Sequence, residues 1–186
     1  MRIVAGTYRG RQLASLPGTE VRPTGDRVRE AVFNALGSMA VIEGARVLDL
    51  FAGSGALGLE ALSRGAQHVT FVDASPQALE MVRANISACE CADSCTVIRS
   101  EALAHLGRNQ TEFDLVLLDP PYEFDAWPEL LSSCDAQTLV IESDRPIDAP
   151  NGSEVVRQRS YGGTVVTVVT RIDSVPNDNV NPEGHL

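Results

Sequence analysis

The sequence contains no lysine, few aromatic residues and no long apolar run, and each absence limits what the protein can be. All 15 basic residues among the 186 are arginine, and aromatic side chains make up 5% of the chain. No apolar stretch approaches the roughly 18 residues that a membrane helix needs, and Arg2, Arg9 and Arg11 interrupt the start, where a secretory leader would lie. We therefore expect a cytoplasmic protein with no membrane partner.

Cysteine is also scarce, and its spacing does not favour a metal site. Three of the four cysteines, Cys89, Cys91 and Cys95, lie close together in what we interpret as a polar connector. No histidine follows them at zinc-finger spacing. The sequence therefore predicts reduced thiols in a loop and no bound metal.

The length predicts one folded domain with short attachments, because single domains commonly contain about 100–200 residues. We expect an N-terminal basic β extension over residues 1–23 and the main domain over residues 24–172. Residues 173–186 are polar and contain two prolines, too little apolar material to fold, so we expect a disordered tail.

The net charge of -10 is unevenly distributed, which matters for a nucleic-acid partner. Residues 1–31 contain six arginines and three acidic residues, a balance of +3, so the remaining residues carry -13. A basic segment on an acidic body is what a phosphate-binding arm looks like, although an ordinary solvated strand gives the same counts. Charge alone leaves the two interpretations open.

Apolar periodicity predicts alternating strands and helices. From Asp26 to Met39 the apolar residues repeat at helical spacing. After it, residues 47–51 form a strand, residues 53–58 a glycine turn, residues 59–64 a helix, and residues 68–72 a second strand ending at Asp73. Ser75 and Pro76 then supply a cap and a first-turn proline for the next helix.

Further strands complete a mostly parallel sheet. We expect them at residues 96–99, 115–118 and 138–141, with helices at about 102–107 and 125–133 between them. Residues 154–161 and 164–170 flank Gly162-Gly163 and predict a terminal antiparallel hairpin. Residues 1–13 predict a short paired segment outside the main sheet that carries Arg9 and Arg11. The fold class is thus α/β.

The glycine turn points to an adenosine-containing ligand. Gly53, Gly55 and Gly58 follow a strand at the spacing of the mononucleotide fingerprint, and Asp73, at the end of the next strand, can accept hydrogen bonds from both ribose hydroxyls. Asp49, Asp73 and Asp119 all fall at the carboxyl ends of predicted parallel strands, so we expect a carboxylate-rich edge of the sheet. Such an edge suits a sulfonium cation and repels pyrophosphate. We therefore expect S-adenosylmethionine as cofactor and place Phe51, at the end of the strand before the glycine turn, in its site.

A second motif predicts an amine acceptor. The apolar residues 116–118 are followed by Asp119-Pro120-Pro121-Tyr122, and the prolines prevent the strand from continuing. The Asp119 carboxylate and the Pro120 carbonyl offer acceptors to an exocyclic NH2, and the Tyr122 ring offers a stacking face. Taken alone, the same residues also describe a capped turn at a strand end.

Together these segments resemble a known family. DLFAGSGALGLEALSRGA and LLDPPYEF, preceded by RIVAGTYRGRQL and VRPTGDRVREAVFNAL, closely resemble the RsmD-type 16S rRNA guanine-N2 methyltransferases over residues 1–172. The resemblance implies a Rossmann-like class I methyltransferase sheet of seven strands, S-adenosylmethionine as donor, and a guanine N2 of 16S rRNA, in the 30S subunit or its assembly intermediate, as acceptor. We also expect a monomer.

The resemblance also implies roles for individual residues. Gly53 and Gly55 border the donor, Asp73 holds its ribose, and Asp119, Pro120 and Tyr122 hold the guanine. Glu101 occupies the stretch where relatives usually carry Asp or Asn near the donor adenine. We assign RNA binding to Arg9, Arg11, Arg22 and Arg27, which lie in the two N-terminal motifs. The residues leave open an adenine-N6 methyltransferase, a non-catalytic binder of S-adenosylmethionine or RNA, and, more remotely, a dinucleotide oxidoreductase.

Overall fold

The computed structural model describes residues 1–15, 23–108 and 111–172. The predictions made for Arg22 and for the tail at residues 173–186 lie outside the described residues. Among the described residues, no helix combines the length and the apolar character that crossing a membrane requires.

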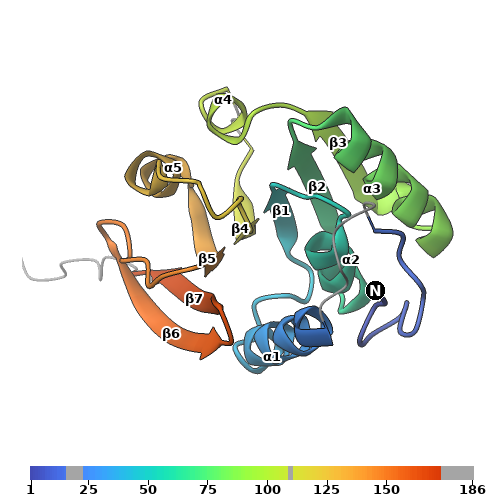
Figure 1. The fold of residues 1–186 in the computed structure, drawn as a ribbon, viewed down its shortest axis with the longest axis horizontal. Helices are drawn as coiled ribbons and strands as arrows, with labels where there is room; N and C mark the ends of the chain where they lie inside the picture. Colours follow the sequence, from blue (N-terminus) through green and yellow to red (C-terminus); the bar gives the residue numbers. More distant parts are fainter. Residues whose placement is uncertain (16–22, 109–110, 173–186) are drawn as a thin grey trace, which may run out of the picture.

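Seven strands form one sheet in the order β3-β2-β1-β4-β5-β7-β6 (Figure 1). The first five in that order are parallel, and β7 runs antiparallel to both of its neighbours. This confirms the predicted parallel core and terminal hairpin. The strands are β1 (Arg46–Leu50), β2 (His68–Asp73), β3 (Cys95–Arg99), β4 (Phe113–Leu118), β5 (Ala136–Ser143), β6 (Ser153–Tyr161) and β7 (Thr164–Arg171).

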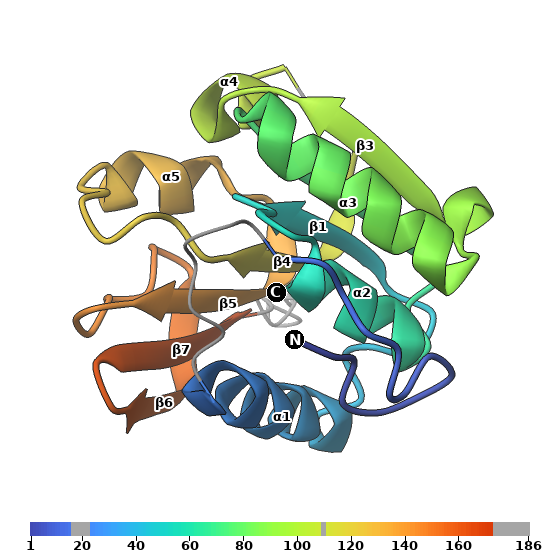
Figure 2. The same ribbon diagram turned by 45° about the vertical axis from the view of Figure 1, so that its right-hand side comes forward.

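Helices cover both faces of the sheet (Figure 2). Buried side chains of α1, α2 and α3 pack with one apolar cluster, and those of α4 and α5 pack with the other. The central strands are buried on both sides, as parallel strands under two helical layers are. The helices are α1 (Pro23–Ser38), α2 (Ala56–Ser63), α3 (Pro76–Cys89), α4 (Ala102–Leu106) and α5 (Trp127–Ser133), with a 3-10 turn at Ala92–Ser94.

The predicted cap of α3 is confirmed. The Ser75 hydroxyl accepts a hydrogen bond from the Ala78 amide at 3.3 Å, and Pro76 occupies the first turn. Proline is tolerated there because its missing N–H would have no partner inside the helix. The same reasoning explains why α1 begins at Pro23, three residues before the predicted start at Asp26.

The N-terminal segment is fastened to the domain. Its two arms meet in an isolated antiparallel bridge between Arg2 and Gln12, and Ile3 and Leu13 are buried in the core. The buried Glu60 carboxylate of α2 accepts hydrogen bonds from the Val4 and Ala5 amides at 2.8 and 3.1 Å. The paired segment outside the main sheet is thus confirmed, and it packs on the core.

The structure corrects two local predictions. Cys89 ends α3 and Cys95 begins β3, so only Cys91 lies in the connector, and it is buried there. Polar neighbours in the sequence hid this, because the chain between α3 and β3 folds back onto the core. Phe51 is not part of β1, which ends at Leu50.

Candidate functional site

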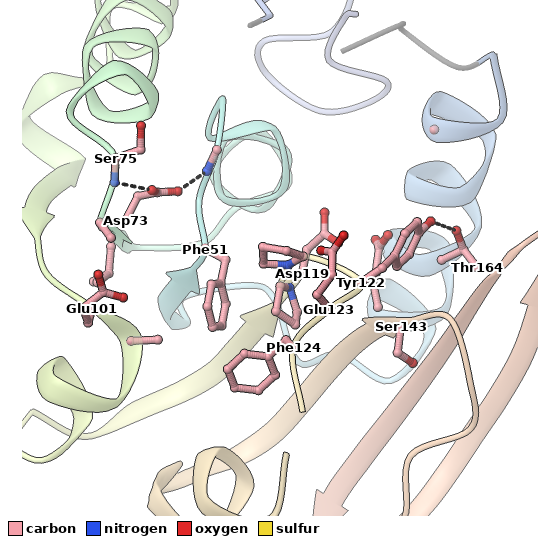
Figure 3. A pocket seen from close by; sticks show the side chains of 18 of the residues that line it. Phe51, Asp73, Ser75, Glu101, Asp119, Tyr122, Glu123, Phe124, Ser143 and Thr164 are labelled. Atoms are coloured by element: carbon pink, nitrogen blue, oxygen red, sulfur yellow. Dashed lines mark hydrogen bonds between the residues drawn. The ribbon is translucent and has the colours of Figure 1, made fainter. Parts of the chain in front are cut away.

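A cavity of about 990 Å³ opens at the carboxyl ends of the parallel strands. It extends from Asp73 and Glu101 at one end to Thr164 and the start of α1 at the other (Figure 3). Asp119 and Tyr122 lie between these ends. Ligands of open α/β sheets bind at this edge, at the point where the strand order reverses. In this sheet that point lies between β1 and β4, because the chain continues from β1 to β2 on one side and from β4 to β5 on the other. We call the Asp73 side the donor end and the Thr164 side the acceptor end.

At the donor end, Asp73 holds two loops together. Its Oδ2 accepts a hydrogen bond from the Gly53 amide at 2.9 Å, and its Oδ1 accepts one from the Ser75 amide at 2.8 Å. Each carboxylate oxygen has a further lone pair, so Asp73 can still accept hydrogen bonds from a ligand in the cavity. Glu101, the residue before α4, also lines this end.

The glycines of the turn have different tasks. Gly53 lines the cavity with a φ of 55°, whereas Gly55, with a φ of 77°, caps α2 and lies away from the cavity lining. A Cβ on Gly55 would lie 3.2 Å from the Phe71 ring. Gly55 therefore serves the close approach of α2 to the sheet, and its predicted contact with the donor stays a prediction. Because Gly55 starts the helix directly, α2 begins at Ala56 and not at residue 59.

A cluster of aromatic side chains borders the middle of the cavity (Figure 3). Phe51 has a φ of 60°, a backbone conformation that costs about 1–3 kcal/mol for a non-glycine residue and is found mainly at functional sites. Its ring meets the edge of Phe124 at a centroid distance of 5.4 Å, and Phe124 meets Trp127 at 5.3 Å. Phe51 and Phe124 line the cavity, so this conformation of Phe51 helps to shape it.

The segment from Asp119 to Phe124 forms the middle of the cavity. The amide of Phe124 donates a hydrogen bond to the Pro121 carbonyl at 2.9 Å, which closes a turn after β4. Tyr122 is 51% exposed, and its hydroxyl lies 3.4 Å from that of Thr164. Within the described part of the chain, neither the Asp119 side chain nor the Pro120 carbonyl has a hydrogen-bond partner. Both acceptors are therefore available to a ligand.

The acceptor end contains residues that the sequence did not indicate. Glu142 of β5 and Gly162 and Gly163 of the β6–β7 turn line it, together with Val28 of α1. Only the folded sheet brings these segments together, since they are separated by many residues in the chain. The turn signal at Gly162-Gly163 predicted the hairpin but not its contribution to a cavity.

The charged side chains that line the cavity are all carboxylates among the described residues. Asp73, Glu101, Asp119, Glu123 and Glu142 line it, and no described lining residue is basic. Water reaches Asp119 from the cavity, yet the surrounding protein desolvates it and raises its pKa to about 6. Burial, reinforced by the Asp119 charge, raises the pKa of Glu142 to about 8. Such a lining suits a cationic ligand and disfavours pyrophosphate.

Asp49 lies beneath the glycine turn and outside the cavity lining. It is buried in β1, and its Oδ2 accepts a hydrogen bond from the Gly58 amide at 2.9 Å. Burial raises its pKa well above the usual range, although the hydrogen bond from Gly58 opposes this shift. Asp49 therefore supports the turn from below, and its predicted contact with the donor stays a prediction.

The arginines of the N-terminal region differ in their surroundings. Arg9 and Arg27 are exposed, whereas Arg11 contacts the Ala88 carbonyl and forms an ion pair with Glu90 at 3.2 Å. Arg29 is buried and pairs with Asp26 at 2.9 Å and with Glu60 at 3.6 Å, so it adds no positive charge to the surface. The surface of this region is thus less basic than its arginine count suggests. Within the described ranges, no three His, Cys, Asp or Glu side chains are grouped to hold a metal ion.

Known proteins share this fold and these segments. The model of a family described as conserved hypothetical protein 95 matches residues 1–170. The chain is 38% identical over 181 residues to the "Putative rRNA methyltransferase YlbH" of Bacillus subtilis, which covers 90% of this chain and 97% of that one. It is 37% identical to the "Ribosomal RNA small subunit methyltransferase D" of Haemophilus influenzae, over 87% of this chain and 89% of the relative.

A solved structure extends the similarity to three dimensions. The "Putative methyltransferase yhhF" of Escherichia coli superposes with a TM-score of 0.81 at 33% identity, over 92% of this chain and 97% of that one. These relatives confirm the expected resemblance to the RsmD-type methyltransferases and the Rossmann-like fold. The chain therefore belongs to the family described as conserved hypothetical protein 95, to which its similarity extends over residues 1–170.

Proposed function

We propose that the protein transfers a methyl group from S-adenosylmethionine to the exocyclic N2 of a guanine in 16S rRNA. The observation that carries this proposal is the pair of unengaged acceptors, the Asp119 carboxylate and the Pro120 carbonyl, between the two ends of one cavity. The small-subunit rRNA methyltransferase named among the relatives supports the same substrate class.

The lining of the donor end fits S-adenosylmethionine. Its sulfonium and ammonium groups are cationic, and the cavity offers carboxylates with no basic side chain among the described lining residues. In this proposal Asp73 accepts hydrogen bonds from the ribose hydroxyls and Glu101 contacts the adenine; both line the donor end. When bound, this donor supplies a methyl group on a positively charged sulfur.

Residues in the middle of the cavity hold the acceptor base in position. A guanine amine is a weak nucleophile because its lone pair is delocalised into the ring, so its direction must be fixed. Asp119 and the Pro120 carbonyl accept hydrogen bonds from the two amine hydrogens, and Tyr122 stacks on the flipped base. After transfer the nitrogen is strongly acidic, so its proton passes to Asp119 or to water without a tuned base.

The substrate is an RNA embedded in a particle. We propose that the protein acts in the cytoplasm, as a monomer, on the 30S subunit or its assembly intermediate. Arg9 and Arg27 are exposed and available for phosphate contacts, and Arg11 can join them if its ion pair with Glu90 opens. Residues 1–23 form the RNA-binding extension in this proposal, and residues 24–172 the methyltransferase domain.

Methyl transfer to undermethylated 30S particles, followed by analysis of the modified base, tests the proposal. N2-methylguanine is the expected product. N6-methyladenine would assign the protein to adenine methylation, and a failure to transfer despite donor binding would assign it to the non-catalytic binders. A rise in melting temperature with NAD but not with S-adenosylmethionine would favour the oxidoreductase alternative.

A further inference from the structure

Glu142 lies beside Asp119 at the floor of the cavity, which is formed by the carboxyl ends of β4 and β5. Strands β4 and β5 are parallel, and their last paired residues are Leu118 and Ile141. Asp119 and Glu142 are the residues that follow Leu118 of β4 and Ile141 of β5, and both line the cavity. Because neighbouring strands are about 4.8 Å apart, a base amine held by Asp119 brings the adjacent ring edge close to Glu142.

Glu142 has no partner of its own in the part of the chain that the structure describes. Neither a hydrogen bond nor an ion pair reaches its carboxyl group, whereas the fully buried Glu60 carboxylate is paired with Arg29 and Arg64. A half-buried polar group that faces a cavity without a partner is available for a ligand.

The surroundings of Glu142 favour its neutral, protonated form. Burial is the largest cause of its raised pKa, about 8; the Asp119 charge from the end of β4 and the Asp49 charge from β1 add to it. The Arg29 guanidinium of α1 opposes the shift without cancelling it. A neutral carboxyl group presents one O–H donor and one carbonyl acceptor side by side.

The orientation of a flipped base follows from its attachment to RNA. The glycosidic bond must lead out to the solvent, so the sugar side of guanine faces the mouth of the cavity and the Watson–Crick edge faces the floor. With N2 at Asp119, the next two groups along that edge are N1–H, a donor, and O6, an acceptor. They match the two groups of a neutral carboxyl.

We infer that Glu142 selects guanine by accepting a hydrogen bond from N1–H and donating one to O6, an inference that rests on the proposed function. Adenine held by its amine offers N1, an acceptor, and then only C2–H, so it forms one hydrogen bond at this position instead of two. Glu142 is therefore a specificity residue, and Asp119 remains the residue that holds the amine.

Two substitutions of Glu142 test this assignment. Glu142→Gln replaces O–H by N–H and keeps both the donor and the acceptor, so kcat/KM for guanine transfer stays within about threefold of the wild type. Glu142→Leu removes both, so kcat/KM falls on the order of 10²-fold. Donor affinity and melting temperature, measured on the same samples, separate this loss from misfolding.

Glu154 offers matched controls, since it lies exposed on β6 and outside the cavity lining. Glu154→Gln and Glu154→Leu leave transfer unchanged. An unchanged kcat/KM for a folded Glu142→Leu, or equal losses for Glu142→Gln and Glu142→Leu, overturns the inference. If the wild-type product is not N2-methylguanine, the proposed function fails instead, whatever the variants do.

Discussion

The Asp73 carboxylate accepts a hydrogen bond from the Gly53 amide at 2.9 Å, which ties the end of β2 to the glycine turn after β1. The same side chain accepts a second hydrogen bond from Ser75 at the start of α3. One carboxylate thus fixes the relative positions of the two loops that form the donor end. Removing it takes away an acceptor for the ligand and loosens the loops around it.

Asp73→Ala is expected to weaken S-adenosylmethionine binding by at least tenfold, because a hydrogen bond to a charged group contributes about 1.5–3 kcal/mol. Isothermal titration calorimetry measures this directly. Asp93→Ala, in the exposed turn before β3, serves as control and leaves the affinity unchanged. An unaltered affinity for Asp73→Ala would mean that the donor's ribose lies elsewhere.

Gly58→Ala is expected to destabilise the fold by about 1–3 kcal/mol, the range for overpacking a core. A Cβ at this position would lie 2.4 Å from the Phe71 ring and 2.9 Å from the Asp49 carboxylate. Gly163→Ala is the matched control, since an added Cβ there meets no atom within 4 Å. Chemical denaturation of both variants checks the difference, and equal stabilities would contradict the packing described for the turn.

Glu142→Gln is expected to raise stability at alkaline pH. The folded-state pKa of Glu142, about 8, lies above its ordinary value of 4.5, so the folded protein holds this proton more tightly than the unfolded chain. The wild type therefore loses stability relative to the variant as pH rises from about 4.5 to about 8. Melting temperatures that coincide at pH 4 and diverge by pH 9 are expected; parallel curves would contradict the shift.

Arg9→Ala together with Arg11→Ala is expected to weaken binding to the 30S particle and to flatten its dependence on salt, because each arginine–phosphate ion pair that is removed reduces the steepness of the salt slope by about 0.7–0.9. Arg9→Ala alone accounts for most of the change, since Arg11 is already paired with Glu90. The exposed Arg108, which follows α4, provides a control. If the dependence of binding on salt stays the same, residues 1–13 do not contact RNA phosphates and form an ordinary solvated surface segment.

Local sequence patterns predicted the helices and strands well, because each pattern depends only on residues that are close together in the chain. Helical spacing predicted α1, the Ser75-Pro76 pair predicted the start of α3, and Gly162-Gly163 predicted the β6–β7 hairpin. The resemblance of whole segments then implied the seven-stranded sheet that the structure confirms.

Burial and long-range pairing were not predictable in this way. Asp49 follows the sequence pattern of a cavity residue, yet the glycine turn folds over it and its carboxylate accepts a hydrogen bond from Gly58. Arg29 is one of the six arginines counted in residues 1–31, yet it is buried and pairs with Glu60 of α2. Glu142 carried no sequence signal because its role depends on β5 lying next to β4, a pairing between segments about twenty residues apart.

The central claim is that Asp119 orients the acceptor amine and does not hold the donor. Single-turnover transfer of labelled methyl from S-adenosylmethionine to 30S particles by Asp119→Ala tests it most directly. The account predicts a rate about 10²-fold or more below the wild type, the range for losing an orienting polar group, with donor affinity largely retained. A near-normal rate would remove Asp119 from the mechanism and contradict the account.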